Sequence, residues 1–276
     1  TNWTNGATLG AAQKCIRLIE WDDKLFALDD LGQLGYSVDE GVTWITHAKS
    51  DLPSGSFTSL FKFDDAAGDV IIYMGTKEGL YALDFENARW VETHLRLPYH
   101  EFGGRGANSW RDAAYVPSGM ALYEYRTTPA LVTRVGPDLD YGLPSAYRGS
   151  IVKVLSGHAA LYALVDATLP VNQTLYPAGV YGDVQIYESE GYSAVLQWKD
   201  YLSIAGKRRG WSVLSLSVAA ATAVTTGMVA TADDIHRIWF GLDNTVYYIP
   251  LPVTIQNPLE LADFAYGASS EDITPW

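Results

Sequence analysis

The chain has 276 residues, of which 48% are apolar, 13% aromatic and only 18% charged. This balance suffices for a large hydrophobic core and favours an all-β domain over helices with long polar faces. The net charge of −13 excludes the basic footprint of a nucleic-acid-binding surface, and the single cysteine, Cys15, excludes an intrachain disulfide and a cysteine zinc cluster.

The first predicted strand covers residues 14–19, and we interpret Cys15 within it as a small core residue. A second apolar strand is expected at 25–28. No run of apolar residues is long enough to insert into a membrane. Because the chain begins without Met and ends abruptly at Trp276, we expect it to be part of a longer protein.

The string Ser-Val-Asp-Glu-Gly-Val-Thr-Trp follows, and each residue type in it suits a tight turn. Asp39 can accept hydrogen bonds from backbone N–H groups of its own turn, and Gly41 supplies a left-handed backbone. The hydroxyls of Ser37 and Thr43 can bond back to the chain, and Trp44 can pack between neighbouring sheets. The string resembles the Asp-box (BNR-repeat) turn between the two outer strands of a β-propeller blade. This resemblance implies a fold and no particular activity.

An internal repeat supports a propeller. Shifting residues 25–44 by 46 positions places strand 25–28 on 71–74 and Trp44 on Trp90. Leu-Pro pairs also recur at spacings of 45 and 46 residues, and each precedes a new apolar strand. These pairs are at 52–53, 97–98 and 143–144, and the strands that follow them are predicted at 58–63, 112–116 and 151–155. A period in the mid-forties with about four strands per unit is characteristic of a propeller.

Two further units complete the predicted ring. The fourth closes with Trp211, a predicted counterpart of Trp44 and Trp90, and the terminal residues 1–13 and 253–276 are expected to complete the last blade. The remaining predicted strands are 150–155, 161–165, 192–198, 225–230, 236–241 and 245–251. We therefore predict one all-β domain over residues 1–276, a β-propeller of about five blades, with six as the alternative. Each blade has four antiparallel strands, and terminal strands close the ring.

A propeller glycosidase is the main enzymatic alternative. A sialidase-like site needs three arginines that converge on a carboxylate; Arg17 lies in an inner strand, and only Arg111 comes near a matching position. A three-carboxylate site could be drawn from acids after inner strands, where Asp is also expected for structural reasons. We expect no catalytic residue among these acids, which are Glu20, Asp22, Asp23, Asp64, Asp65, Asp112, Glu124 and Asp166.

Two loops are candidate ligand contacts. Loop 99–110 combines aromatic rings, one arginine and glycines that we interpret as mobile, which suits stacking on a sugar or a peptide. Loop 168–183 is a second candidate contact or assembly surface. The residues singled out as ligand-binding are Tyr99, His100, Arg105, Trp110, Tyr176 and Tyr181.

Neither a metal nor a cofactor is expected. The histidines show no pair at metal spacing, and residues 138–142 carry only a fragment of calcium-loop spacing, so we interpret them as a turn. No phosphate-binding or dinucleotide-binding fingerprint is present in the sequence.

Four strings resemble propeller regions of uncharacterised structural proteins of tailed bacteriophages; they lie at 135–144, 161–166, 192–196 and 246–252. The resemblance implies a virion or tail role, with other virion proteins or a host-surface glycan or receptor as partners in an oligomeric assembly. We therefore predict a non-enzymatic structural or receptor-contacting module located on a virion or outside the cell. A propeller-type glycoside hydrolase and a bacterial extracellular lectin are the alternatives.

Overall fold

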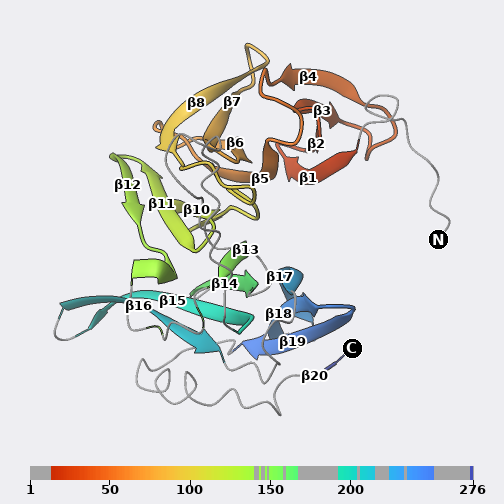
Figure 1. Cartoon of the computed structure of the whole chain (residues 1–276). Helices are drawn as coiled ribbons and strands as arrows, with labels where there is room; N and C mark the ends of the chain where they lie inside the picture. The colour runs from red at the N-terminus through yellow and green to blue at the C-terminus, as the bar shows by residue number, and fades with distance from the viewer. Residues whose placement is uncertain are drawn as a thin grey trace, which may run out of the picture. The chain divides into compact units, whose positions relative to one another are not determined.

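The computed structural model describes residues 14–139, 143, 147, 149–157, 160–166, 192–203, 206–214, 224–232, 235–251 and 274–275. These residues form five four-stranded antiparallel sheets and a short 3-10 helix, Pro137–Leu139, and the same residues include no α-helix. Each sheet is one blade, so the predicted all-β fold of a five-bladed β-propeller is confirmed (Figure 1).

Within each sheet, strands that follow one another in sequence lie side by side. The first sheet is β1 (Cys15–Trp21), β2 (Lys24–Asp29), β3 (Gln33–Ser37) and β4 (Ile45–Lys49). The second is β5 (Phe57–Asp64), β6 (Val70–Thr76), β7 (Gly79–Asp84) and β8 (Arg89–Arg96). The third is β9 (Asn108–Trp110), β10 (Ala113–Ser118), β11 (Ala121–Thr127) and β12 (Ala130–Arg134). The fourth is β13 (Ser150–Ser156), β14 (Leu161–Asp166), β15 (Ala194–Ser203) and β16 (Gly206–Leu214). The fifth is β17 (Val224–Ala232), β18 (Ile235–Leu242), β19 (Thr245–Leu251) and β20 (Thr274–Pro275).

The chain divides into two compact units. One contains the residues up to Val116 together with Glu124–Thr133, and the other contains Pro117–Tyr123 and the residues from Arg134 onward. Each unit has its own hydrophobic core. We describe the two separately, and the prediction of a single domain stays a prediction.

The core of the first unit is built from the first and second sheets. Phe26 and Leu28 of β2 pack in one cluster with Ile72 and Met74 of β6. The 46-residue shift in sequence places Phe26 on Ile72 and Leu28 on Met74. Trp90 is half-buried against this cluster. The indole Nε1 of Trp21 donates to the carbonyl of Val70 at 2.9 Å and joins the two sheets. The repeat therefore reflects equivalent packing positions in consecutive sheets.

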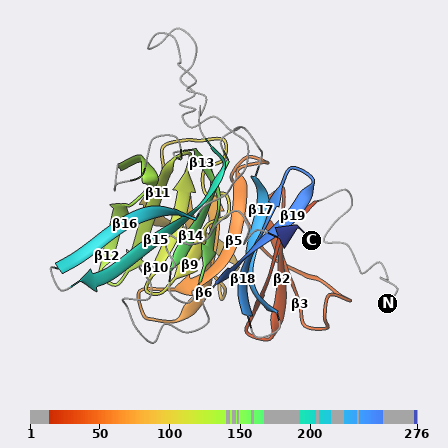
Figure 2. The ribbon, with the colours of Figure 1, turned by 90° about the horizontal axis from the view of Figure 1, so that it is seen from below.

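In the second unit, two tryptophans on neighbouring strands pack against each other. Trp198 of β15 faces Trp211 of β16 with ring centroids 5.1 Å apart, and Trp211 Nε1 donates to the carbonyl of Val135 at 2.7 Å. The two strands run together as one long hairpin, paired from Val195 with Leu214 to Ser203 with Gly206 (Figure 2). Trp211 thus lies on the last strand of its sheet, where it was predicted.

The turn between β3 and β4 has the hydrogen bonds predicted for it. Asp39 accepts from the Thr43 N–H at 2.8 Å, from the Thr43 hydroxyl at 2.6 Å and from the Ser37 hydroxyl at 2.7 Å. Gly41 has a φ of 88°, and its N–H donates to the Ser37 hydroxyl at 2.8 Å. Trp44 is half-buried, with its ring beside Gly41. The turn is therefore closed by its own side chains.

We predict that Thr43→Val raises the pKa of Asp39. Hydrogen bonds from the Thr43 hydroxyl, the Thr43 N–H and the Ser37 hydroxyl lower this pKa to about 2. Because the folded pKa is depressed, Asp39 stabilises the fold above the ordinary pKa of about 4, and this contribution is lost as the pH falls towards 2. Loss of the Thr43 hydroxyl should bring the pKa of Asp39 closer to its ordinary value and so narrow the pH range over which this stability is lost. NMR titration of the Asp39 carboxyl carbon measures this pKa. Thr46→Val, at an exposed position on β4, is the control, and equal titration in both variants would contradict the prediction.

Two expectations differ from the structure. The first strand of the third sheet is β9, at 108–110, whereas the strand predicted at 112–116 falls on the turn and on β10. Trp110 pairs directly with Ala113, so Arg111 and Asp112 form a two-residue turn, with Arg111 at a φ of 54°. Cys15 is exposed rather than a core residue, because it begins β1, a strand in which no residue is buried.

The last sheet is completed by residues near the C-terminus. Thr274 pairs with Tyr248 and Pro275 with Tyr247, so β20 supplies the fourth strand, as expected for a segment within 253–276. The expected contribution of residues 1–13 lies outside the described residues, as do the predicted turn residues 140–142.

Candidate functional site

The loop after β8 is held against the second sheet by backbone hydrogen bonds. Leu97 N–H donates to the carbonyl of Glu78 at 2.7 Å, and His100 N–H donates to the carbonyl of Lys77 at 3.4 Å. Further along, Gly103 N–H donates to the His100 carbonyl at 2.8 Å. The Phe102 N–H donates to Nδ1 of His100 at 3.1 Å. The buried His100 is therefore a structural anchor of the loop.

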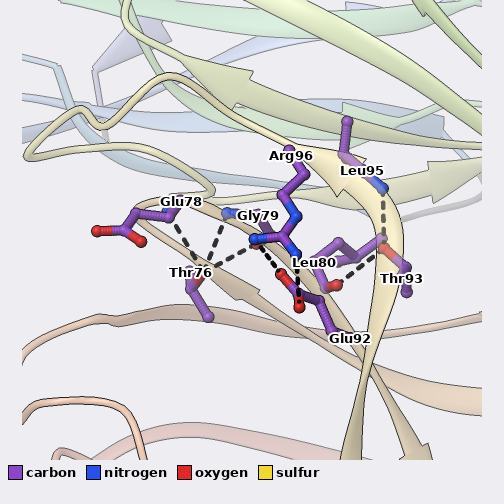
Figure 3. A network of polar contacts seen from close by, with 8 residues as sticks. All are labelled: Thr76, Glu78, Gly79, Leu80, Glu92, Thr93, Leu95 and Arg96. Carbon is purple, nitrogen blue, oxygen red and sulfur yellow. Dashed lines mark hydrogen bonds and ion pairs between the residues drawn. The ribbon is translucent and has the colours of Figure 1, made fainter.

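The turn that receives this loop is itself fixed by a threonine hydroxyl. Thr76 Oγ1 donates to the carbonyl of Gly79 at 3.0 Å and accepts from the N–H groups of Glu78 and Gly79 (Figure 3). In β8, the Thr93 hydroxyl donates to the carbonyl of Leu80 at 2.8 Å (Figure 3). The β6–β7 turn is thus a rigid support for the loop.

Two glycines in the loop make its close approach to the sheet possible. A Cβ at Gly103 would lie 2.7 Å from the carbonyl oxygen of Lys77, and a Cβ at Gly104 would lie 2.6 Å from that of Thr76. Gly104 also has a φ of 68°. These glycines, which sequence reasoning interpreted as mobile, instead allow backbone to pack on backbone.

The loop presents part of its aromatic content to the surface. Tyr99 is 38% exposed, and Phe102 and Arg105 are half-buried, with the Arg105 Cζ 5.7 Å from the Phe102 ring centroid. Trp110 is 5% exposed and belongs to β9, where Arg111 Cζ lies 4.2 Å from its ring centroid. Of the residues singled out from the sequence, Tyr99, His100 and Arg105 lie in this loop, and the Phe102 ring lies near both His100, with ring centroids 5.9 Å apart, and Arg105. Phe102 was not singled out from the sequence, although it stands between His100 and the glycine pair Gly103–Gly104 in the same loop.

A second arginine lies near this surface. Partial burial of the guanidinium, together with the nearby charge of Arg105, lowers the pKa of Arg17 in β1. Its Nη1 donates to the carbonyl of Ile16 at 2.6 Å, although much of the side chain is exposed. The Arg105 guanidinium therefore lies beside the half-buried Phe102 ring, and its charge acts on Arg17. Two positive charges that act on each other suit an anionic group. We define Arg17, Tyr99, Phe102 and Arg105 as the arginine–aromatic surface.

The other predicted candidates occupy separate positions. Tyr176 and Tyr181 lie outside the described residues. Four of the eight acids considered from the sequence, Asp22, Asp23, Asp65 and Asp112, lie in turns between strands, and the other four lie within strands. Asp22 pairs with Lys24 at 2.5 Å. Glu124 is buried and pairs with Arg126 at 2.6 Å, and Arg126 also contacts Asp112.

The described ranges contain neither a cluster of metal ligands nor a membrane-spanning helix. No three His, Cys, Asp or Glu side chains of these ranges are grouped so that they could hold a metal ion. Nor is any helix of this part of the chain long and apolar enough to cross a bilayer.

Comparisons with known proteins show the fold alone. No protein-family model and no curated protein matches the chain. Among solved structures, the extracellular domain of the putative one-component system BT4673 from B. thetaiotaomicron is 13% identical with a TM-score of 0.58; the match covers 89% of this chain and 28% of that one. YCF48 bound to D1 peptide is 8% identical with a TM-score of 0.54; the match covers 89% of this chain and 66% of that one.

Proposed function

We propose that the chain is a non-enzymatic propeller module that contacts a partner through the arginine–aromatic surface. The partner chemistry that this surface favours is a carboxylated sugar of a host-surface glycan. An aromatic ring can stack on the apolar face of a sugar, and a guanidinium can bond to a carboxylate in bidentate geometry. The observation that carries the proposal is the position of Arg105 beside the Phe102 ring on a loop that backbone hydrogen bonds fix to the sheet. The charge of Arg105 also acts on Arg17 of β1.

The setting that we propose is the surface of a bacteriophage particle or another extracellular assembly, with other virion proteins as further partners. The turn at Ser37–Trp44, which we assign to the Asp-box type, and the phage-like strings support this setting. The similarity in fold to an extracellular domain and to a propeller bound to a peptide is compatible with it. Genes for phage morphogenesis on either side of its gene would support the virion setting, whereas secretion or cell-envelope genes would support a bacterial lectin.

We predict that Arg105→Ala weakens binding to carboxylated glycans by about tenfold or more, because a charge-assisted hydrogen bond contributes about 1.5–3 kcal/mol. A glycan array of neutral and carboxylated sugars identifies the ligand, and titration calorimetry with the best one gives the affinity. Tyr99→Ala tests the aromatic contribution.

The control is Arg89→Ala, because Arg89 is exposed on β8 and pairs with Asp84 rather than with the loop. Equal loss in the two arginine variants would contradict the assignment of the site. Hydrolysis of a fluorogenic glycoside panel by the unaltered chain would contradict a non-enzymatic role.

A further inference from the structure

A second surface of the first unit is hollowed. A groove of about 610 Å3 lies between the second and third sheets, entirely within the first unit. Its walls are the β5–β6 turn, the strands β6, β7 and β8 with the turn between the last two, and the hairpin of β11 and β12. The hydroxyl of Thr128 donates to the carbonyl of Ala66 at 3.1 Å and ties two of these walls together. The volume is within the range of ligand sites, about 300–1,000 Å3.

The base of the groove is apolar and aromatic. Tyr73 and Tyr125 line it and are only 2% and 5% exposed. Tyr73 lies against Phe61 with ring centroids 5.9 Å apart, and its hydroxyl donates to the carbonyl of Asp64 at 3.3 Å. Ile71 and Leu83 also line the groove. The base is therefore held in place by packing, and the apolar area open to an occupant comes from the half-buried Ile71 and Ala82 and the exposed Val91.

The rim of the groove is acidic. Asp65, Asp69, Asp84 and Glu86 line it, and no lysine or arginine does. Asp84 is neutralised by Arg89 at 2.9 Å, whereas the other three carboxylates form no ion pair with the part of the chain described by the structure. Burial first, and then the nearby Tyr125, Asp65 and Asp64, raise the pKa of Tyr73. The groove therefore has a negative potential.

Strand alternation explains why no cation balances this rim. In β11, Tyr125 and Thr127 face the groove, while the intervening Arg126 pairs with Glu124 on the opposite face. The strand next to it, β12, is the last of its sheet, so one of its edges has no strand partner within that sheet. Its first residue, Ala130, lines the groove, and the following Leu131 and Val132, which do not, are 51% and 40% exposed. An extended chain beside β12 would find backbone bonding groups and apolar contacts.

We propose that this groove binds an extended segment of a protein partner in which basic residues alternate with apolar ones. Charge complementarity selects Lys or Arg side chains for the rim at Asp65, Asp69 and Glu86, and the apolar residues cover the base. A small free cation would use the rim alone and leave the base exposed. The site is separate from the arginine–aromatic surface, which favours the opposite charge, so it does not rest on the glycan contact proposed above.

The test is binding of a short fluorescein-labelled peptide of alternating lysine and valine, followed by fluorescence anisotropy. The variant D69N/E86Q should weaken binding by about tenfold, because two rim charges are lost. The matched control D51N/E40Q removes the same charge from exposed positions that do not line the groove and should bind as the unaltered chain does. A peptide of alternating glutamate and valine should not bind.

Each of these results would overturn the proposal: no saturable binding of the lysine–valine peptide, equal weakening in the two double variants, or displacement of the peptide by spermidine at the peptide's own concentration. Displacement by spermidine would mean that the rim binds any cation. The thermal unfolding midpoint of each variant should match that of the unaltered chain, because Asp69 and Glu86 are exposed. Blocking the base with Ala130→Trp, at an exposed position on the groove wall, should also abolish peptide binding, and unchanged binding there would equally overturn the proposal.

Discussion

Phe26→Ala is expected to lower the free energy of unfolding by about 3–5 kcal/mol. Phe26 is fully buried in β2, and its ring lies 5.6 Å from Trp21, 5.7 Å from Tyr36 and 6.1 Å from Phe85 between centroids. Phe85 comes from the β7–β8 turn, so the cavity would weaken packing between the first and second sheets as well as within the first. Chemical denaturation of the full chain measures the loss.

Two variants separate cavity formation from the mere loss of an apolar residue. Phe26→Leu keeps most of the volume and should cost about 1–1.5 kcal/mol. Leu31→Ala removes a side chain that is 42% exposed in the β2–β3 turn and should change stability by about 0.5 kcal/mol or less. A loss in Phe26→Ala no greater than in Leu31→Ala would show that the cluster around Phe26 does not support the fold.

The blades could be predicted because apolar strands and tryptophans recur at equivalent positions in the sequence. Apolar strands at 25–28 and 71–74 fall on β2 and β6, and Trp90 and Trp211 lie on the last strands of their sheets. The hydrogen-bonding role of each residue type in the Asp39 turn could also be predicted, though not that both hydroxyls donate to the Asp39 carboxylate, because its donors and acceptors are all within a few residues of one another. Interactions that are local in sequence can be inferred from sequence.

The first strand of the third sheet could not be predicted in the same way. Asn108–Trp110 is only three residues long and directly follows a glycine-rich loop, so no alternation is visible. Its assignment depends on pairing with Ala113–Tyr115 across the turn at Arg111. The same loop misled the interpretation of Gly103 and Gly104, because their close contacts are with residues near position 77, far away in sequence.

The two candidate sites differ in how much of them the sequence could indicate. Tyr99 and Arg105 are close in sequence, so the loop could be recognised as a candidate site. Arg17 is far from them in sequence, and only the fold brings its charge near that of Arg105. The groove brings together Tyr73 and Tyr125, which are far apart in the chain. Its rim acids stand in hairpin turns, where aspartate has an ordinary structural explanation, so no sequence pattern distinguishes them.

Gly32→Ala is expected to lower the free energy of unfolding by about 2–5 kcal/mol through two separate effects. Gly32 has a φ of 76°, which is unfavourable for any residue with a Cβ. In addition, an added Cβ would lie 2.3 Å from Cζ of Phe57, a buried ring of β5 that packs in the core of the first unit. The ring would have to move, and the packing of the second sheet on the first would be disturbed.

Gly55→Ala separates these effects, because Gly55 has nearly the same φ, 79°, and nothing within 4 Å of an added Cβ. It should cost only the backbone part, about 1–2 kcal/mol. The difference between the two glycine variants then measures the collision with Phe57, and combining Gly32→Ala with Phe57→Leu should recover part of it. Equal losses at the two glycines, or no recovery in the double variant, would mean that the ring accommodates the methyl group and that the contact between β5 and the β2–β3 turn is not closely packed.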